Sequence, residues 1–231
     1  RLNLLQQGDA ISPSEGFGKR PGIKRVGLMG GTFDPIHYGH LVTAEVARAK
    51  FCLDLVIFVP AGIPPHKRGV RISSRTDRYM MTVMATLTNP CFEVSRTELD
   101  RPGPSYAIDT VRHLKKEFDE ETEIFFITGA DAAIEILTWK DAKDLLKECG
   151  FIVATRPGCS TGELERRLME ARLHSTHCIC MVEVPALAIS STDIRRRVEQ
   201  GEPIRYLLPM NVENYVYKTG LYQKKCNNDK K

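Results

Sequence analysis

Long apolar runs, regularly spaced cysteines and a concentrated basic region are all missing from this chain of 231 residues. No apolar stretch approaches the length of a membrane span, so no membrane association is expected. The seven cysteines have no regular disulfide spacing, which makes the reducing cytoplasm the simplest setting. Lys and Arg are scattered and the net charge is only +4, so nucleic acid is not an expected partner. This mild positive charge suits small anionic molecules.

Two common phosphate-binding motifs are missing as well. The chain has neither a G-x-x-x-x-G-K-[ST] P-loop nor the G-x-G-x-x-G dinucleotide fingerprint. Residues 30–40 instead read GGTFDPIHYGH, between an apolar run and a helical pattern. The glycine pair allows backbone N–H groups to approach an anion, and the start of the next helix adds partial positive charge. His37 and His40 project to one side and can donate hydrogen bonds to phosphate oxygens. This loop therefore predicts a polyphosphate site.

The order of elements predicts an α/β fold. Strand and helix patterns alternate, which is typical of a parallel sheet covered on both faces. We expect one domain with a Rossmann-like, doubly wound parallel sheet over residues 24–222, and flexible ends at 1–23 and 223–231. Strands are expected at 24–29, 54–60, 92–99, 123–128, 151–155 and 179–184. Helices are expected at 37–51, 74–88, 105–118, 191–199 and 211–219, with a further helical region around Trp139.

A second candidate phosphate segment lies far along the chain, at residues 189–195, ISSTDIR. Its hydroxyls and free backbone N–H groups open a helix, and Arg195 follows one turn later, where its guanidinium can bind the same phosphate oxygens. The alternative is an ordinary Ser N-cap followed by solvated arginines. Because ligands of such sheets bind beyond the carboxyl ends of the strands, the loops at 64–67, 129–131 and 156–158 should share this site.

These motifs together resemble a known family. Residues 30–40 resemble the signature of the H-x-G-H nucleotidyltransferases, which are relatives of the catalytic domain of class I aminoacyl-tRNA synthetases. With residues 189–195, Gly129-Ala130-Asp131, Trp139 and the ending 209–222, the chain resembles the bacterial nicotinate-nucleotide adenylyltransferases from about residue 24 to 222. The resemblance implies a single nucleotidyltransferase domain. It also implies adenylyl transfer from ATP to nicotinate mononucleotide in NAD biosynthesis, by direct in-line attack on the α-phosphate, with deamido-NAD and pyrophosphate as products.

The resemblance further implies Mg²⁺ bound with ATP, no metal site of the protein's own, and roles for matching residues. The implied catalytic residues, which neutralise phosphate charge, are His37, His40, Lys67 and Arg195. The implied ATP-binding residues are Gly30, Gly31, Thr32, Phe33, Gly129, Asp131, Ile189, Ser190 and Ser191. The implied acceptor-binding residues are Ser105, Tyr106 and Trp139, of which Trp139 would stack on the pyridine ring. A core role for Trp139 is the alternative. Ala107 and Lys140 depart from the family's usual Thr and aromatic residues, which leaves the preference for nicotinate over nicotinamide open.

Other functions remain as alternatives. One is another H-x-G-H transferase, with nicotinamide mononucleotide or pantetheine phosphate as the acceptor. A second is a non-catalytic nucleotide-sensing module, and a third is a tRNA-synthetase fragment, which the missing K-M-S-K-S-like loop disfavours. The cluster His174, His177, Cys178 and Cys180 lacks the spacing of a zinc site, so buried thiols are expected there. The oligomeric state is left open, a homo-oligomer included.

Overall fold

The computed structural model describes residues 19–64, 72–157, 162, 166, 179–185 and 187–224. Within them, six strands form one sheet in the order β3-β2-β1-β4-β5-β6, and every neighbouring pair is parallel. The strands are β1 Arg25–Gly31, β2 Leu55–Pro60, β3 Phe92–Val94, β4 Glu123–Gly129, β5 Gly150–Thr155 and β6 Ile179–Glu183. Strand order reverses between β1 and β4, so the predicted doubly wound sheet is confirmed and its switch point lies beside β1.

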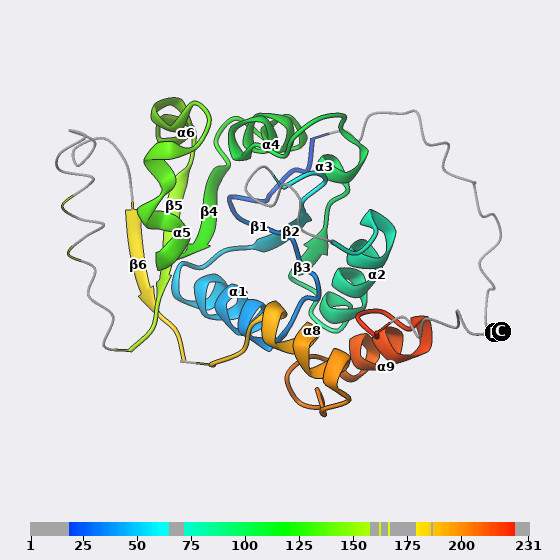
Figure 1. Ribbon diagram of the computed structural model, residues 1–231. Coiled ribbons are helices and arrows are strands. Elements are labelled where there is room, and N and C mark those ends of the chain that lie inside the picture. Colours follow the sequence, from blue (N-terminus) through cyan, green and yellow to red (C-terminus); the bar gives the residue numbers. More distant parts are fainter. Residues whose placement is uncertain are drawn as a thin grey trace, which may run out of the picture.

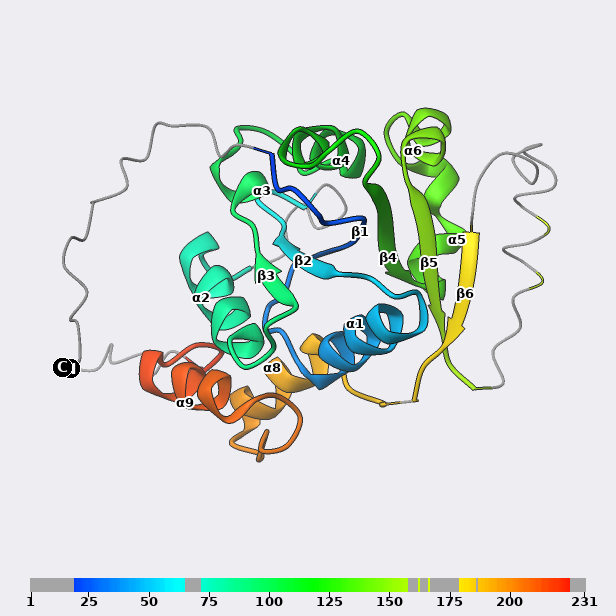
Figure 2. The same cartoon turned by 180° about the vertical axis from the view of Figure 1, so that it is seen from behind.

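Helices cover both faces of the sheet (Figures 1 and 2). They are α1 Tyr38–Lys50, α2 Arg75–Thr86, α3 Thr97–Asp100, α4 Ala107–Leu114, α5 Ala130–Ile134, α6 Ala142–Glu148, α8 Ser191–Gln200 and α9 Met210–Thr219, with short 3-10 turns at η2 Lys115–Glu117 and η3 Ile136–Thr138. One face packs against α1, α2, α8 and α9, and the other against α4, α5 and α6.

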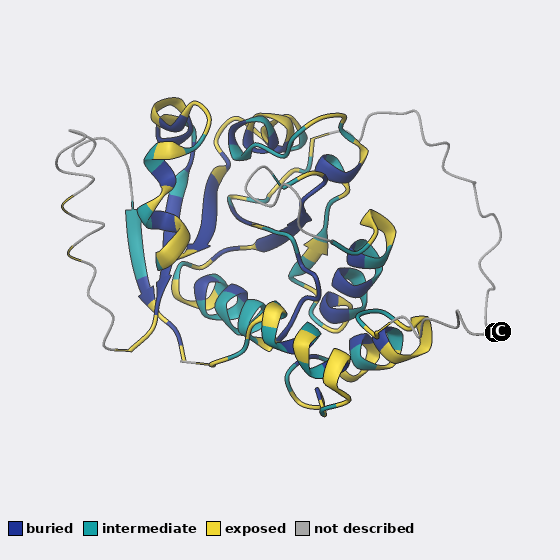
Figure 3. Ribbon diagram, in the orientation of Figure 1, coloured by how far each residue is buried: buried dark blue, intermediate teal, exposed yellow. Residues whose placement is uncertain are grey.

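Side chains alternate along the strands between these two layers. On β2, Val56 and Phe58 face the α1 side, whereas Leu55, Ile57 and Val59 face the α4 side. Both sets are buried, which is why β2 reads as a continuous apolar run and not as an alternating one. Figure 3 shows the buried central strands between helices whose outer faces are exposed, whereas the edge strands β3 and β6 are mostly intermediate in burial. None of the described helices is long and apolar enough to cross a membrane.

One expected element is wrong in its extent. The predicted strand 92–99 is only three residues long, because the chain leaves the sheet after Val94 and forms α3. The Thr97 backbone N–H donates to Ser95 Oγ at 3.2 Å, a local turn that competes with continued strand pairing. Trp139 also differs slightly from expectation, since it lies in an extended link between η3 and α6. The predicted strand at 24–29 extends to Gly31, directly into the glycine loop.

The last two helices end as predicted. Gly201 and Gly220 follow α8 and α9 in the left-handed conformation, with φ of 72° and 67°. Both helices lie beside α1 and α2 in Figures 1 and 2. They therefore bring the C-terminal third of the chain next to the loop that follows β1.

Candidate active site

Two adjoining cavities lie at the carboxyl ends of the strands. The first has a volume of about 370 Å³, and the predicted residues that line it are Gly30, His37, His40, Gly129, Asp131 and Ile189. The second has a volume of about 250 Å³, and the predicted residues that line it are Gly30, Gly31, Thr32, Ser105, Tyr106 and Trp139. Gly30 lines both cavities, so they meet at the end of β1, beside the switch point. Of the predicted ATP-binding residues, Gly129, Asp131 and Ile189 line only the first cavity, whereas Gly31 and Thr32 line the second cavity together with the predicted acceptor residues.

The two histidines of the loop are in direct contact. His37 precedes the first turn of α1, and the centroids of its ring and the His40 ring are 3.8 Å apart. The His37 backbone N–H donates to His40 Nδ1 at 3.3 Å. Because Nδ1 accepts this hydrogen bond, the proton of a neutral His40 ring is on Nε2. His40 is therefore set to donate from Nε2.

His37 is the more buried of the pair, with 6% of its surface exposed. Burial lowers the pKa of its imidazole to about 4, so the ring is neutral at physiological pH. A Cβ added at Gly39 would lie 2.9 Å from His37 Nδ1, which explains why a glycine separates the two histidines. The H-x-G-H spacing thus packs two imidazoles closely without charging the inner one.

Phe33 packs against the ring of His40. Its backbone has a positive φ of 49°, and its side chain is 2% exposed. Its ring packs edge-on against His40, with centroids 5.1 Å apart, and a Cβ on Gly31 would lie 2.8 Å from it. The Phe33 side chain belongs to the core and lines neither of the two cavities.

The segment 189–195 meets the glycine loop, although the two are distant in sequence. Ser190 Oγ accepts the Asp193 backbone N–H at 3.1 Å, which caps α8. Ser191 Oγ donates to the Pro35 carbonyl at 2.8 Å, and Arg195 Nη1 donates to the Asp34 carbonyl at 2.7 Å. Arg195 itself lines a neighbouring cavity of about 630 Å³ and not the cavity of the histidines, which also lacks Ser190 and Ser191. Residues 189–195 therefore contact the loop that carries the histidines, as predicted. Their side chains at Ser190, Ser191 and Arg195 do not line the cavity of the histidines.

The second cavity, named the acceptor-side cavity because the predicted acceptor residues line it, combines aromatic rings with the cation of Lys140. Trp139 lines it while packing edge-on against Phe126, with centroids 5.6 Å apart. Lys140 Nζ lies 4.7 Å from the centroid of the Tyr106 ring and 3.3 Å from Asp109 Oδ2. Trp139 therefore contacts the core and also lines the cavity.

Some residues singled out in the sequence lie outside the described residues. They are Lys67, a predicted catalytic residue, and three members of the cluster that lacks zinc-site spacing, His174, His177 and Cys178.

Three residues without an assigned role in the sequence analysis also belong to this region. Glu98 lines the acceptor-side cavity at 7% exposure; burial raises its pKa, and the Thr110 hydroxyl donates to it at 2.6 Å. No sequence signal identified Glu98, because it falls within the expected strand 92–99. Arg156 lines the histidine cavity, and only its position after a strand indicated this. Asp34 is 3% exposed, and its place in the glycine motif was the available signal.

The carboxylates of the site are few. Asp131 is the only acidic residue among the described residues that line the histidine cavity. The described part of the chain contains no group of three or more His, Cys, Asp or Glu side chains that could hold a metal ion.

Known proteins share the sequence and the fold of this chain. The family model described as cytidylyltransferase-like matches residues 28–197. A protein of Thermoanaerobacter sp. (strain X514) named "Probable nicotinate-nucleotide adenylyltransferase" is 57% identical over 200 residues, covering 87% of this chain and 95% of its own. The protein of the same name from Moorella thermoacetica is 57% identical over 204 residues, covering 88% and 93%.

The fold also matches a solved structure. Plasmodium falciparum nicotinic acid mononucleotide adenylyltransferase complexed with NaAD has a TM-score of 0.67 to this chain, with coverage of 86% of this chain and 97% of that one. At 18% identity, this likeness supports the fold alone. The family model matches most of the chain, and these two relatives are 57% identical to it along nearly their whole length. The chain therefore belongs to the nicotinate-nucleotide adenylyltransferase family of cytidylyltransferase-like proteins.

Proposed function

We propose that this protein transfers the adenylyl group of ATP to nicotinate mononucleotide, giving deamido-NAD and pyrophosphate. The observation that carries the proposal is the pair of cavities that meet at Gly30, one with the two histidines and one with aromatic walls. Their junction suits two nucleotides whose phosphates react with each other. The names of the relatives, which are 57% identical, support the same activity.

ATP occupies the histidine cavity in this proposal. Gly30 lines this cavity and allows the phosphates to approach the backbone, and His37 and His40 lie at the start of α1, whose partial positive charge attracts anions. Asp131 accepts a hydrogen bond from a ribose hydroxyl next to Gly129, where an added Cβ would have nothing within 4 Å. We also propose that Lys67 and Arg195 contact the phosphates of ATP.

In this proposal, nicotinate mononucleotide occupies the acceptor-side cavity. Trp139 stacks on the pyridine ring, and backbone groups near Ser105 and Tyr106 bind its carboxylate. Lys140 brings a positive charge to the wall of this cavity, and this charge favours nicotinate over the neutral nicotinamide. Ala107 and Lys140, the two departures from the family that left the acceptor open, thus both line this cavity.

Mg²⁺ fits this site as an ion carried by ATP. Mg²⁺ prefers oxygen ligands and keeps several waters, and it usually needs only one or two carboxylates in addition to substrate phosphates. The one carboxylate in the described lining of the histidine cavity, Asp131, is assigned to the ribose, so the ATP phosphates and waters would supply the ligands of the ion. When bound with ATP, Mg²⁺ would supply charge neutralisation for the phosphates and the leaving pyrophosphate.

The protein's part in the reaction is positioning and charge stabilisation. An oxygen of the mononucleotide phosphate forms a bond to the α-phosphorus of ATP, and the bond to the bridging oxygen of pyrophosphate breaks. The nucleophile is already an anion at neutral pH, so no general base is needed. His40, as an Nε2–H donor, stabilises charge on the phosphates as the bond breaks.

The experiment that tests the proposed function compares acceptors directly. Pyrophosphate release is measured with ATP, Mg²⁺ and either nicotinate mononucleotide, nicotinamide mononucleotide or pantetheine phosphate. We expect nicotinate mononucleotide to give the highest kcat/KM. A preference for another acceptor would replace the proposed substrate, and ATP binding without turnover on any acceptor would favour the nucleotide-sensing alternative.

Trp139→Ala is expected to raise the KM for nicotinate mononucleotide by about tenfold and to change kcat little, because ring stacking contributes binding of roughly 1 kcal/mol or more. Steady-state kinetics at saturating ATP measure both values, and Trp139→Phe serves as the variant that keeps an aromatic face. If Trp139 is only a core residue, the melting temperature of Trp139→Ala will fall while the KM stays that of the wild type.

A further inference from the structure

The loop that carries the histidines is held from outside by the C-terminal third of the chain. Ser191 and Arg195 donate to the carbonyls of Pro35 and Asp34, as described above. The Tyr38 backbone N–H donates to the Leu207 carbonyl at 3.1 Å. These bonds come from α8 and the link between α8 and α9, so the loop depends on distant segments for its position.

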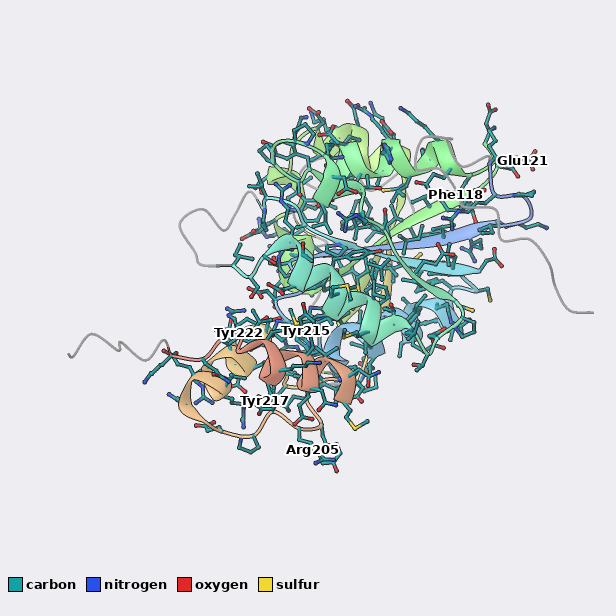
Figure 4. The ribbon with its side chains drawn as sticks, turned by 90° about the vertical axis from the view of Figure 1, so that its right-hand side faces the viewer. Phe118, Glu121, Arg205, Tyr215, Tyr217 and Tyr222 are labelled. Carbon is teal, nitrogen blue, oxygen red and sulfur yellow. The ribbon has the colours of Figure 1, made fainter. Side chains whose placement is uncertain are left out.

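A further restraint comes from Tyr222, which follows α9 and lies beyond the residues matched by the family model. Its hydroxyl donates to Asp34 Oδ1 at 2.7 Å, and the other carboxylate oxygen, Oδ2, accepts the Ser73 backbone N–H at 3.2 Å. Burial, together with the Asp34 carboxylate, raises the pKa of Tyr222, so the hydroxyl stays protonated and remains a donor. Figure 4 shows Tyr222 between the C-terminal helices and α2.

Among the described residues, Tyr222 and the Ser73 backbone N–H are the donors to the Asp34 carboxylate. Asp34 is 3% exposed, so water does not replace a lost donor at low cost. The nearby Arg78 is 1% exposed, and its Nη1 and Nε donate to the carbonyls of Thr32 and Ser73 at 2.9 and 3.1 Å. Because the Asp34 carboxylate is held at both oxygens, it restrains the backbone of the loop at this position. His37 follows only three residues later in the same loop.

We propose that Tyr222 is a positioning residue of the active site, whose hydroxyl holds Asp34 and thereby sets the loop that presents His37 and His40. The proposal rests on the proposed function for its kinetic readout. It assigns Tyr222 a part in catalysis through Asp34, since Tyr222 lines neither the histidine cavity nor the cavity with Trp139.

Tyr215 provides a matched control. Its hydroxyl also donates to a carboxylate, Asp77 Oδ1, at 2.9 Å, and it comes from the same C-terminal region (Figure 4). Asp77 lies in the first turn of α2 and not in the histidine loop. Tyr215→Phe therefore removes an equivalent hydrogen bond between α9 and α2 and leaves the loop restraints unchanged.

The experiment compares Tyr222→Phe with Tyr215→Phe in the full chain. We expect Tyr222→Phe to lower kcat by about tenfold with the KM for ATP within about twofold of wild type, because a small misplacement of catalytic groups acts mainly on the reaction step. Tyr215→Phe should keep both values within about twofold. Assays are run well below the melting temperature of each variant, so that unfolding does not contribute.

A second readout is independent of turnover. The ¹⁵N resonances of His40 report its hydrogen bond at Nδ1, and we expect them to shift in Tyr222→Phe and not in Tyr215→Phe. Equal kcat in wild type and Tyr222→Phe, or equal losses in the two variants, would overturn the proposal. If the wild type turns over no acceptor, the proposed function fails, and the positioning role is then decided by the His40 resonances alone.

Discussion

His40→Ala is expected to lower kcat by roughly two to three powers of ten, with a smaller change in the KM for ATP. The variant removes a donor that is already oriented, because the His37 backbone N–H binds Nδ1 and leaves the proton on Nε2. Loss of one preorganised donor to developing negative charge typically costs this much in kcat, since the interaction is stronger in the transition state than with bound ATP. Pyrophosphate release at saturating substrates measures the effect.

The control for this variant is His113→Ala, which removes an exposed imidazole on α4, away from both cavities. His113→Ala should keep wild-type kinetics. Because the His40 ring also packs against Phe33 and His37, the melting temperature of His40→Ala is measured alongside its kcat. A kcat for His40→Ala within about threefold of wild type would remove His40 from the proposed catalytic residues.

The second large effect concerns stability at acid pH. Burial lowers the pKa of His37 from 6.5 to about 4 in the folded protein. Between these values the unfolded chain binds a proton that the folded state does not, so stability falls as the pH drops from about 6.5 to about 4. The full window corresponds to about 3 kcal/mol, at 1.36 kcal/mol for each pKa unit. Below the folded-state pKa, His37 contributes no further loss.

Chemical unfolding at a series of pH values tests this expectation. His37→Gln should lack the His37 part of the loss, so the difference in unfolding free energy between wild type and variant should change by about 3 kcal/mol across the window. His113→Gln, which changes an exposed histidine, should follow the wild-type curve. Parallel curves for wild type and His37→Gln would show that His37 is not desolvated in the folded state.

The sequence was most informative where the determinants are local. The glycine pair, the two histidines and the start of α1 are consecutive, so their chemistry could be predicted from eleven residues in register. The strands were predicted from apolar runs, which work because a parallel strand is buried on both faces. The prediction failed at residues 95–99, where a hydrogen bond between Ser95 and Thr97 starts α3 in place of more strand.

The acceptor side was less predictable. The resemblance associates Trp139 with the pyridine ring, whereas Glu98 had no signal, because it falls within an expected strand and a carboxylate is rarely buried. The predicted meeting of residues 189–195 with the glycine loop was correct in outline. The sequence could not indicate that Arg195 binds the Asp34 carbonyl and faces a neighbouring cavity, since side-chain direction depends on packing.

The amino-acid order by itself determined the alternation of strands and helices, the loop of glycines and histidines, and the family, because each is encoded in neighbouring residues or in a short period. Only the tertiary structure decided which pairs of distant groups meet: the two cavities at Gly30, the stacked histidines with a desolvated inner ring, and the bond between Tyr222 and Asp34 across 188 positions. The physical reason is that burial and hydrogen-bond geometry are properties of the packed layers. They follow from where α8 and α9 dock, and no local pattern specifies that docking.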